Sequence, residues 1–175
     1  MAKSILSICL AFLLSLQSCQ SAANANLEAE QIEARRATLF TAISKLEGRW
    51  ELLEAPDPGF IEFRLTSHGT ALIETMHPGT DEEMINMYTL DGDSVVMRHY
   101  CALGNQPFMR ALDLVDGKLV FVPEGVQDLE SPESMYMSDM TITFVSEDRV
   151  DETWRGVMDG QQVEMPVFKM QRVSR

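Results

Sequence analysis

The stretch "KLEGRWELL" (residues 45–53) decides the fold, because the spacing of apolar residues changes within it. Upstream, apolar residues recur at helical steps and form one stripe, which predicts a helix over residues 27–47. That stripe consists of Ile32, Leu39, Ile43 and Leu46. Downstream of Trp50, apolar and polar residues alternate as they do in strands with one buried face. Gly48 stands at the change and is a suitable residue to end the helix.

From residue 48 onward the sequence predicts about ten short strands separated by compact turns. Asp and Gly in "DGD" (91–93), "DG" (116–117) and "SED" (146–148) are typical of hairpin turns. No strand–helix–strand unit follows residue 48, so the strands are expected to be antiparallel and consecutive. Closing them into a ring removes exposed edges. The predicted strands cover residues 49–55, 60–66, 70–76, 84–90, 94–101, 108–115, 118–122, 138–145, 149–155 and 163–171.

The predicted fold is therefore mainly β: a closed antiparallel up-and-down barrel of about 8–10 strands over residues 48–175, preceded by one N-terminal helix. The opening "LEGRWEL" and the closing "FKMQRV" resemble the first and last strands of lipocalin and fatty-acid-binding (calycin) barrels. This resemblance implies that Arg172 lies over Trp50, a cation–π contact worth roughly 0.5–2 kcal/mol. The segments "YTLDGD" and "HYCALGNQP" also resemble a group of bacterial exported lipocalin-like proteins without an assigned activity.

The N-terminus predicts export. Lys3 precedes an apolar run over residues 5–16, which is too short for a membrane span and matches a signal peptide over residues 1–18. "LQSC" (16–19) resembles the bacterial lipobox, which implies lipidation at Cys19 and a tether over residues 19–26. Cleavage after "ANA" (23–25) is the alternative and would give a soluble periplasmic or secreted protein. We therefore expect a location in the bacterial cell envelope, with a lipid anchor in the membrane.

The cysteine count excludes a disulfide-stabilised fold, and the net charge disfavours a nucleic-acid-binding protein. Once the signal is removed and Cys19 is lipidated, Cys101 is the one cysteine left, so no intramolecular disulfide is possible. The chain carries 27 acidic and 14 basic residues, a net charge of −13. Because this charge repels phosphate backbones and no cluster of Lys and Arg offsets it, we expect no nucleic-acid partner.

Successive connections of a meander alternate between the two ends of a barrel, and the longer ones gather at one end. These are residues 55–59, 77–83, 102–107, 123–134 and 158–162, whereas the connections at 66–69, 91–93, 116–117 and 146–148 are short. The sequence thus predicts an open end that admits ligands and a sealed end near the helix. His68 falls at the sealed end. The candidate ligand-contacting residues at the open end are His77, Met97, His99, Cys101, Met135 and Met137.

Several side chains are predicted to point into the barrel: Ile73, Met97, His99, Leu112, Leu114, Phe121, Ile142, Phe144 and Trp154. For "MINMYTL" (84–90) either face could point inward. Methionine suits an adaptable apolar pocket, but the same side chains could equally fill a solid core.

The stretch "HYCALGNQP" (99–107) is compatible with two chemistries, and the acids of residues 81–83 offer a third. A nucleophile pair of Cys101 and His99 is disfavoured, because residues i and i+2 of a strand lie about 6.6–7 Å apart. Binding of a metal or haem through His99 stays an alternative, although no spaced ligand motif supports it. The acids Asp81, Glu82 and Glu83 are expected to be solvated. We predict no catalytic residue, no metal ligand and no cofactor, and leave open whether the protein is an enzyme.

The leading hypothesis is an exported, lipid-anchored lipocalin-like protein that binds a small apolar molecule at the open end. The alternative from another class is an envelope structural or interaction protein with a solid core. The oligomeric state is not predicted.

Overall fold

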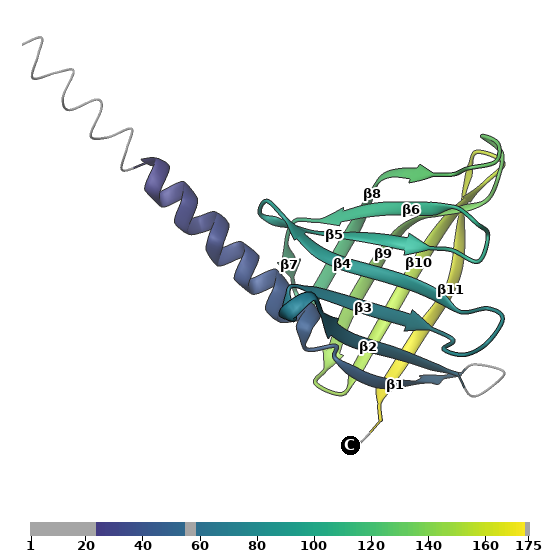
Figure 1. Ribbon diagram of the computed structural model, residues 1–175, viewed down its shortest axis with the longest axis horizontal. Helices are drawn as coiled ribbons and strands as arrows, with labels where there is room; N and C mark the ends of the chain where they lie inside the picture. Colours follow the sequence, from purple (N-terminus) through teal and green to yellow (C-terminus); the bar gives the residue numbers. More distant parts are fainter. Residues whose placement is uncertain (1–23, 55–58, 174–175) are drawn as a thin grey trace, which may run out of the picture.

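The alternation that begins at Gly48 builds one continuous antiparallel sheet, seen in a computed structural model that describes residues 24–54 and 59–173 (Figure 1). The predicted signal peptide and Cys19 lie outside the described residues. The elements are β1 (Gly48–Leu53), β2 (Phe60–Thr66), the short helix η1 (Ser67–Gly69), β3 (Ala71–Met76), β4 (Met84–Asp91), β5 (Ser94–Tyr100), β6 (Gln106–Ala111), β7 (Leu114–Val115), β8 (Lys118–Gln127), β9 (Tyr136–Ser146), β10 (Arg149–Met158) and β11 (Gln161–Arg172).

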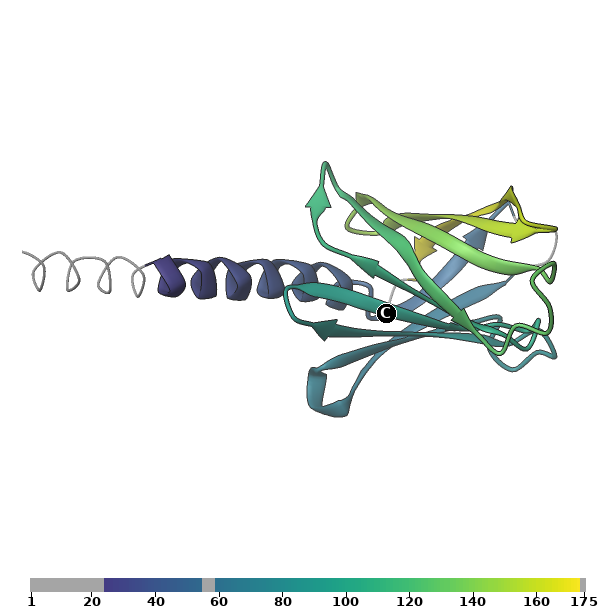
Figure 2. The same cartoon turned by 90° about the horizontal axis from the view of Figure 1, so that it is seen from above.

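The sheet closes on itself. The strands from β1 to β6 each pair with the next, as do those from β7 to β11, β1 pairs with β11, and β6 pairs with β8. The resulting ring has ten strands, and β7 lies beside β8 outside it. This confirms the predicted fold class, and the architecture is compatible with a lipocalin-like barrel. Figure 2 shows the barrel from the side, with the helix extending from one end.

Turn chemistry fixes the short connections. Asp116 and Gly117 both have positive φ, 50° and 71°, which is the backbone of a tight hairpin between β7 and β8. The predicted strand over residues 108–115 is in fact divided, because β6 ends at Ala111 and β7 begins at Leu114. Conversely, β8 runs to Gln127 and shortens the loop predicted over residues 123–134.

Among the described residues, the N-terminal helix covers 24–44, so residues 24–26, predicted as part of the tether, are helical. Its last turns bury Leu39, Ile43 and Leu46 against the end of the barrel. Residues 24–34 are exposed and extend beyond the barrel, so Ile32, 39% exposed, does not belong to the buried stripe (Figures 1 and 2). Contact with the barrel begins at Arg35, whose guanidinium lies 2.6 Å from the Asp93 carboxylate. Within residues 24–54 and 59–173, no helix combines the length and apolar character that a membrane span requires.

Trp50 and Arg172 fasten this helix to the barrel. The Arg172 guanidinium carbon lies 4.2 Å from the Trp50 ring centroid, the contact that the resemblance implies. The Trp50 indole donates to the Leu46 carbonyl at 2.7 Å, and Arg172 donates to the carbonyls of Lys45 and Glu47 at 2.6 and 2.8 Å. These bonds satisfy the carbonyl groups of the turn that joins the helix to β1. Gly48 is needed beside them, because its φ is +131° and a Cβ there would lie 3.1 Å from Arg172 Nη1.

Side chains from alternate positions fill the lumen. Of the positions predicted to face inward, Met97, Phe121, Ile142 and Trp154 are buried. Two of those predictions are wrong. Leu112 is 47% exposed because it follows the end of β6, and Ile73 lies on the outer face, since its neighbours Leu72 and Glu74 are the buried ones. In β4, the face with Asn86 and Tyr88 points inward.

Candidate functional site

A polar cluster crosses the lumen from one wall of the barrel to the other. Glu74 on β3 and Glu152 on β10 are both fully buried, and their carboxyl groups lie close enough for each to shift the pKa of the other. Burying charged or strongly polar groups costs several kcal/mol unless each is paired. The sequence analysis missed this cluster, although Glu74 is in phase with the inward Leu72 and Met76, and Glu152 with the inward Val150 and Trp154.

Hydrogen bonds converge on Glu74. Its Oε2 atom accepts from the Asn86 amide at 2.7 Å and from the Tyr88 hydroxyl at 2.6 Å. The Oε2 atom of Glu152 accepts from the Trp154 indole at 3.3 Å. The Oε1 atoms of the two carboxyl groups are buried and have no hydrogen-bond partner among the described residues. Because two neighbouring buried carboxylates repel each other, the pair favours holding one proton.

The shared proton belongs mainly to Glu152. Burial, followed by the negative charge of Glu74, raises the pKa of Glu152 well above its usual value. Burial also raises the pKa of Glu74, to about 6, but its hydrogen-bond donors oppose that rise. At neutral pH these shifts favour an ionised Glu74 beside a protonated Glu152, which gives the lumen one negative charge.

His99 joins the cluster as a neutral imidazole. Its Nδ1 atom lies 2.6 Å from Asn86 Oδ1, and because the Asn86 amide nitrogen donates to Glu74, Nδ1 must be the donor. Burial lowers the pKa of His99 to about 4. The ring centroid lies 5.2 Å from that of Trp154. Nε2 is then an unprotonated acceptor, and no described residue donates to it.

The residues predicted for the open end do not form one cluster. Met97 and His99 are buried in the lumen, whereas Cys101, Met135 and Met137 are half-buried at the rim. His77, also half-buried, packs against Phe168 of β11, with 6.3 Å between ring centroids. At the rim, Asn105 links the loop between β5 and β6 to the segment before β9, because its amide donates to the Met135 carbonyl at 2.9 Å.

Neither a cysteine nucleophile nor a clustered metal site is built at the rim. Burial raises the pKa of the Cys101 thiol, which disfavours the reactive thiolate. Among the described residues, no group of three or more His, Cys, Asp or Glu side chains could hold a metal ion. Binding of a metal or haem through the free Nε2 of His99 stays a prediction.

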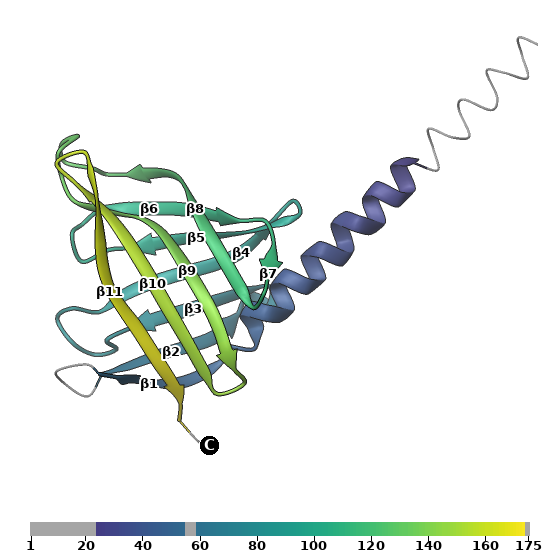
Figure 3. The same cartoon turned by 180° about the vertical axis from the view of Figure 1, so that it is seen from behind.

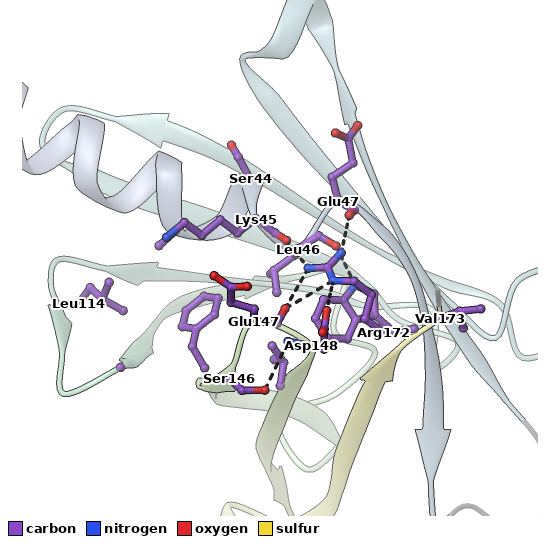
Figure 4. A pocket seen from close by; sticks show the side chains of 15 residues that line it. Ser44, Lys45, Leu46, Glu47, Leu114, Ser146, Glu147, Asp148, Arg172 and Val173 are labelled. Carbon is purple, nitrogen blue, oxygen red and sulfur yellow. Dashed lines mark hydrogen bonds and ion pairs between the residues drawn. The ribbon is translucent and has the colours of Figure 1, made fainter. Parts of the chain in front are cut away.

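A pocket of about 820 Å³ lies at the opposite end, between the last turn of the helix and the barrel (Figure 4). Its walls come from the helix, the β7–β8 hairpin, the β9–β10 turn and the end of β11, which Figure 3 shows around the foot of the helix. Its apolar wall consists of Ala42, Leu46, Trp50, Leu114, Phe144 and Val150. A volume of roughly 300–1,000 Å³ with apolar and aromatic walls is usual for small-molecule sites.

Charged groups border this pocket without filling it. Arg172 is occupied by the carbonyls of Lys45 and Glu47 and by the carboxylate of Asp148, 3.3 Å away. Figure 4 shows Lys45 and Glu147 at the border, where both charges can face water. The pocket therefore suits a mainly apolar molecule. It also corrects the expectation of a sealed end, because the helix covers one side of the barrel floor and leaves a hollow beside it.

A second hollow, of about 430 Å³, lies on the outside of the barrel along β7 and β8. Its lining combines exposed apolar side chains, which are Leu112, Val115, Val120 and Val122 (each 47–60% exposed), with the charged residues Arg110, Asp113, Asp116 and Lys118. A row of exposed apolar residues on one strand pair is a feature of contact surfaces more than of ligand sites.

No known protein family matches this chain, and no curated protein matches it. Any function must therefore be inferred from the fold and from four regions: the polar cluster, the rim, the helix-end pocket and the outer hollow.

Proposed function

We propose that the protein is an exported, lipid-anchored, lipocalin-like barrel that binds a small, mainly apolar molecule. The observation that carries this proposal is the pocket of about 820 Å³ at the helix end, with Trp50, Leu114 and Phe144 in its wall. Apolar walls supply affinity by removing ligand surface from water, at about 25 cal/mol per Å². The open end, favoured by the sequence, is the alternative location, and one experiment separates the two.

Native mass spectrometry and organic extraction of the purified protein test for a bound molecule, and a hydrophobic fluorophore titrated into extracted protein tests for an empty site. Saturable uptake supports the proposal. An extracted protein that takes up no hydrophobic probe refutes it.

Matched variants locate the site. Leu114→Asp places a charge in the pocket wall and should weaken fluorophore binding about tenfold or more. Leu112→Asp is the control, because Leu112 is 47% exposed and lies outside the pocket. Met137→Asp makes the same change at the rim. Loss of binding in Met137→Asp alone would move the site to the open end.

The anchor is tested separately. The proposal predicts that the mature protein fractionates with membranes and begins at a lipidated Cys19, seen by mass spectrometry of its N-terminal peptide. Cys19→Ser should release the protein from the membrane. A mature N-terminus at Asn26 would instead support cleavage after "ANA" (23–25).

A second candidate function is that of an envelope interaction protein, favoured by the exposed apolar row on β7 and β8. Replacing Val115 and Val120, 60% and 48% exposed, by Lys should then abolish co-purification of a partner or self-association while ligand uptake is unchanged. Unaltered sedimentation and co-purification would exclude this function for the row.

A further inference from the structure

The outer hollow has an apolar side chain projecting beside it. The β7–β8 hairpin turns at Asp116 and Gly117 and stands out from the wall at the helix end of the barrel, coloured teal to green in Figure 2. Val115 on this hairpin is 60% exposed, the highest value among the large apolar side chains of the described residues. The hollow of about 430 Å³ is also lined by three exposed apolar residues, Leu112, Val120 and Val122. Water therefore contacts both an apolar projection and an apolar recess next to it, a feature of interaction surfaces.

Two opposite charges stand at the tip of the same hairpin. Arg110, which also lines the hollow, is already paired with Asp91 and Glu124. Asp116 and Lys118 line the hollow too, but within residues 24–54 and 59–173 neither side chain belongs to an ion pair or accepts or donates a hydrogen bond. The hairpin tip thus offers one negative and one positive charge to a molecule that docks beside it.

The balance of charge selects the kind of molecule. The chain has a net charge of −13, so two copies repel each other over most of their surfaces and can meet only where acids and bases balance. The hollow is such a region, because its lining contains two bases and two acids: Arg110, Lys118, Asp113 and Asp116. A strongly basic molecule would be attracted by the acidic surface as a whole and not by this neutral patch.

The hairpin is also complementary to itself. A contact with two-fold symmetry presents the same patch to itself, so each feature must fit its own copy. When two hairpins lie side by side in opposite directions, with the symmetry axis at Gly117, Asp116 of each copy is opposite Lys118 of the other. The same arrangement brings the projecting Val115 of each copy to the apolar recess of the other.

We propose that the outer hollow binds a second copy of this chain, by reciprocal exchange of the β7–β8 hairpins. Val115 of each copy enters the hollow of the other, and Asp116 and Lys118 pair across the symmetry axis. The proposal names a partner for the second candidate function above and rests on that function. Leu114 is one of the helix-end pocket residues and is not part of the hollow, so ligand uptake does not depend on the dimer.

Sedimentation equilibrium of the purified mature protein, in a density-matched detergent, tests for the dimer. The unaltered protein should self-associate reversibly, and Val115→Lys should weaken self-association about tenfold or more, because it places a charge in an apolar contact. Val167→Lys is the matched control, since Val167 is 44% exposed on β11 and lies outside the hollow, and it should change nothing. An unaltered protein that stays monomeric at millimolar concentration would overturn the proposal.

Charge reversal tests the arrangement of the two hairpins. Lys118→Asp and Asp116→Lys should each weaken self-association about tenfold, because like charges then face each other at two symmetric places. An equal mixture of the two variants should associate again as a heterodimer, since every contact across the axis then joins opposite charges. No association in a mixture of two folded variants would overturn the hairpin exchange, and the result on the unaltered protein stands whether or not Asp116→Lys folds.

The possible failures are distinguishable. A monomeric protein that co-purifies another protein, and loses it in Val115→Lys, would keep the second candidate function and refute a second copy as the partner. A monomeric protein without any co-purifying protein would refute both. Fluorophore uptake reports separately on the helix-end pocket.

Discussion

Replacing Glu152 by Gln should stabilise the protein at neutral pH. Glutamine keeps the geometry, since its oxygen can accept from Trp154 and its amide can donate to Glu74. The unfolded chain releases the Glu152 proton near pH 4.5, but the folded chain retains it because its pKa is raised. A raised acid pKa contributes stability that is complete below pH 4.5 and is lost as pH rises towards the folded pKa.

The magnitude follows from this linkage. Each pH unit over which the folded protein holds a proton that the unfolded chain has lost costs about 1.4 kcal/mol. The stability advantage of Glu152→Gln should therefore be near zero at pH 4.5 and should widen by up to about 3 kcal/mol between pH 5 and 7. The contributions of Glu74 and His99 are present in both proteins and largely cancel in this difference.

Urea unfolding at half-unit steps from pH 4.5 to 8 measures the difference. Glu51→Gln, which replaces an exposed glutamate on β1, serves as the control, and its stability difference from the unaltered protein should not change with pH. A stability difference for Glu152→Gln that is also independent of pH, or that decreases as pH rises, would refute the protonated carboxyl pair.

Three further predictions concern the same contacts. Because burial lowers the pKa of His99 to about 4, the contribution of His99 to stability is present above pH 6.5 and is lost as pH falls towards 4, by up to about 3 kcal/mol. In urea unfolding, His99→Gln should therefore reduce the loss of stability between pH 6.5 and 4. An unchanged loss in this variant would contradict a buried neutral ring. Tyr88→Phe removes a hydrogen-bond donor to ionised Glu74 and should lower the free energy of unfolding by about 1.5–3 kcal/mol at pH 7.5. The loss should be smaller at pH 5, where Glu74 is protonated. An equal loss at both pH values would count against an ionised acceptor. Arg172→Lys should lower the free energy of unfolding, measured by thermal unfolding, by about 2–3 kcal/mol, because an ammonium cannot stack on Trp50 and also reach the carbonyls of Lys45 and Glu47. The exposed control Arg64→Lys should change stability by less than about 0.5 kcal/mol. Similar values for both variants would show that Arg172 does not hold the helix to the barrel.

Alternation of apolar residues was enough to predict the barrel. A one-residue shift turns every side chain to the other face, so positions such as Phe121 and Ile142 have only one acceptable orientation. Turn chemistry at Asp116 and Gly117 located a hairpin for the same local reason. Residues 24–26 are helical although the sequence assigned them to the tether, since the small polar residues before Leu27 allow a helix without demanding one.

The polar cluster and the pocket were not predicted, for different physical reasons. Glu74 and Glu152 occupy positions whose alternation with their neighbours points inward. Because a charged residue is normally assigned to the outer face, the alternation was not extended to these two positions. The pocket is a volume left between four segments that are distant in sequence, from Ala42 to Arg172. Its existence depends on how far the helix covers the barrel floor, which no local pattern records.

Tryptophan fluorescence tests the central claim most directly, because the chain contains two tryptophans at different levels of the barrel. Trp50 lines the helix-end pocket, and Trp154 lies in the lumen among the polar cluster. In a Trp154→Phe protein, a brominated alkane that occupies the pocket should quench Trp50 emission saturably, and Leu114→Asp should abolish that quenching. Absence of saturable Trp50 quenching, with or without quenching of Trp154 in a Trp50→Phe protein, would contradict a ligand site at the helix end.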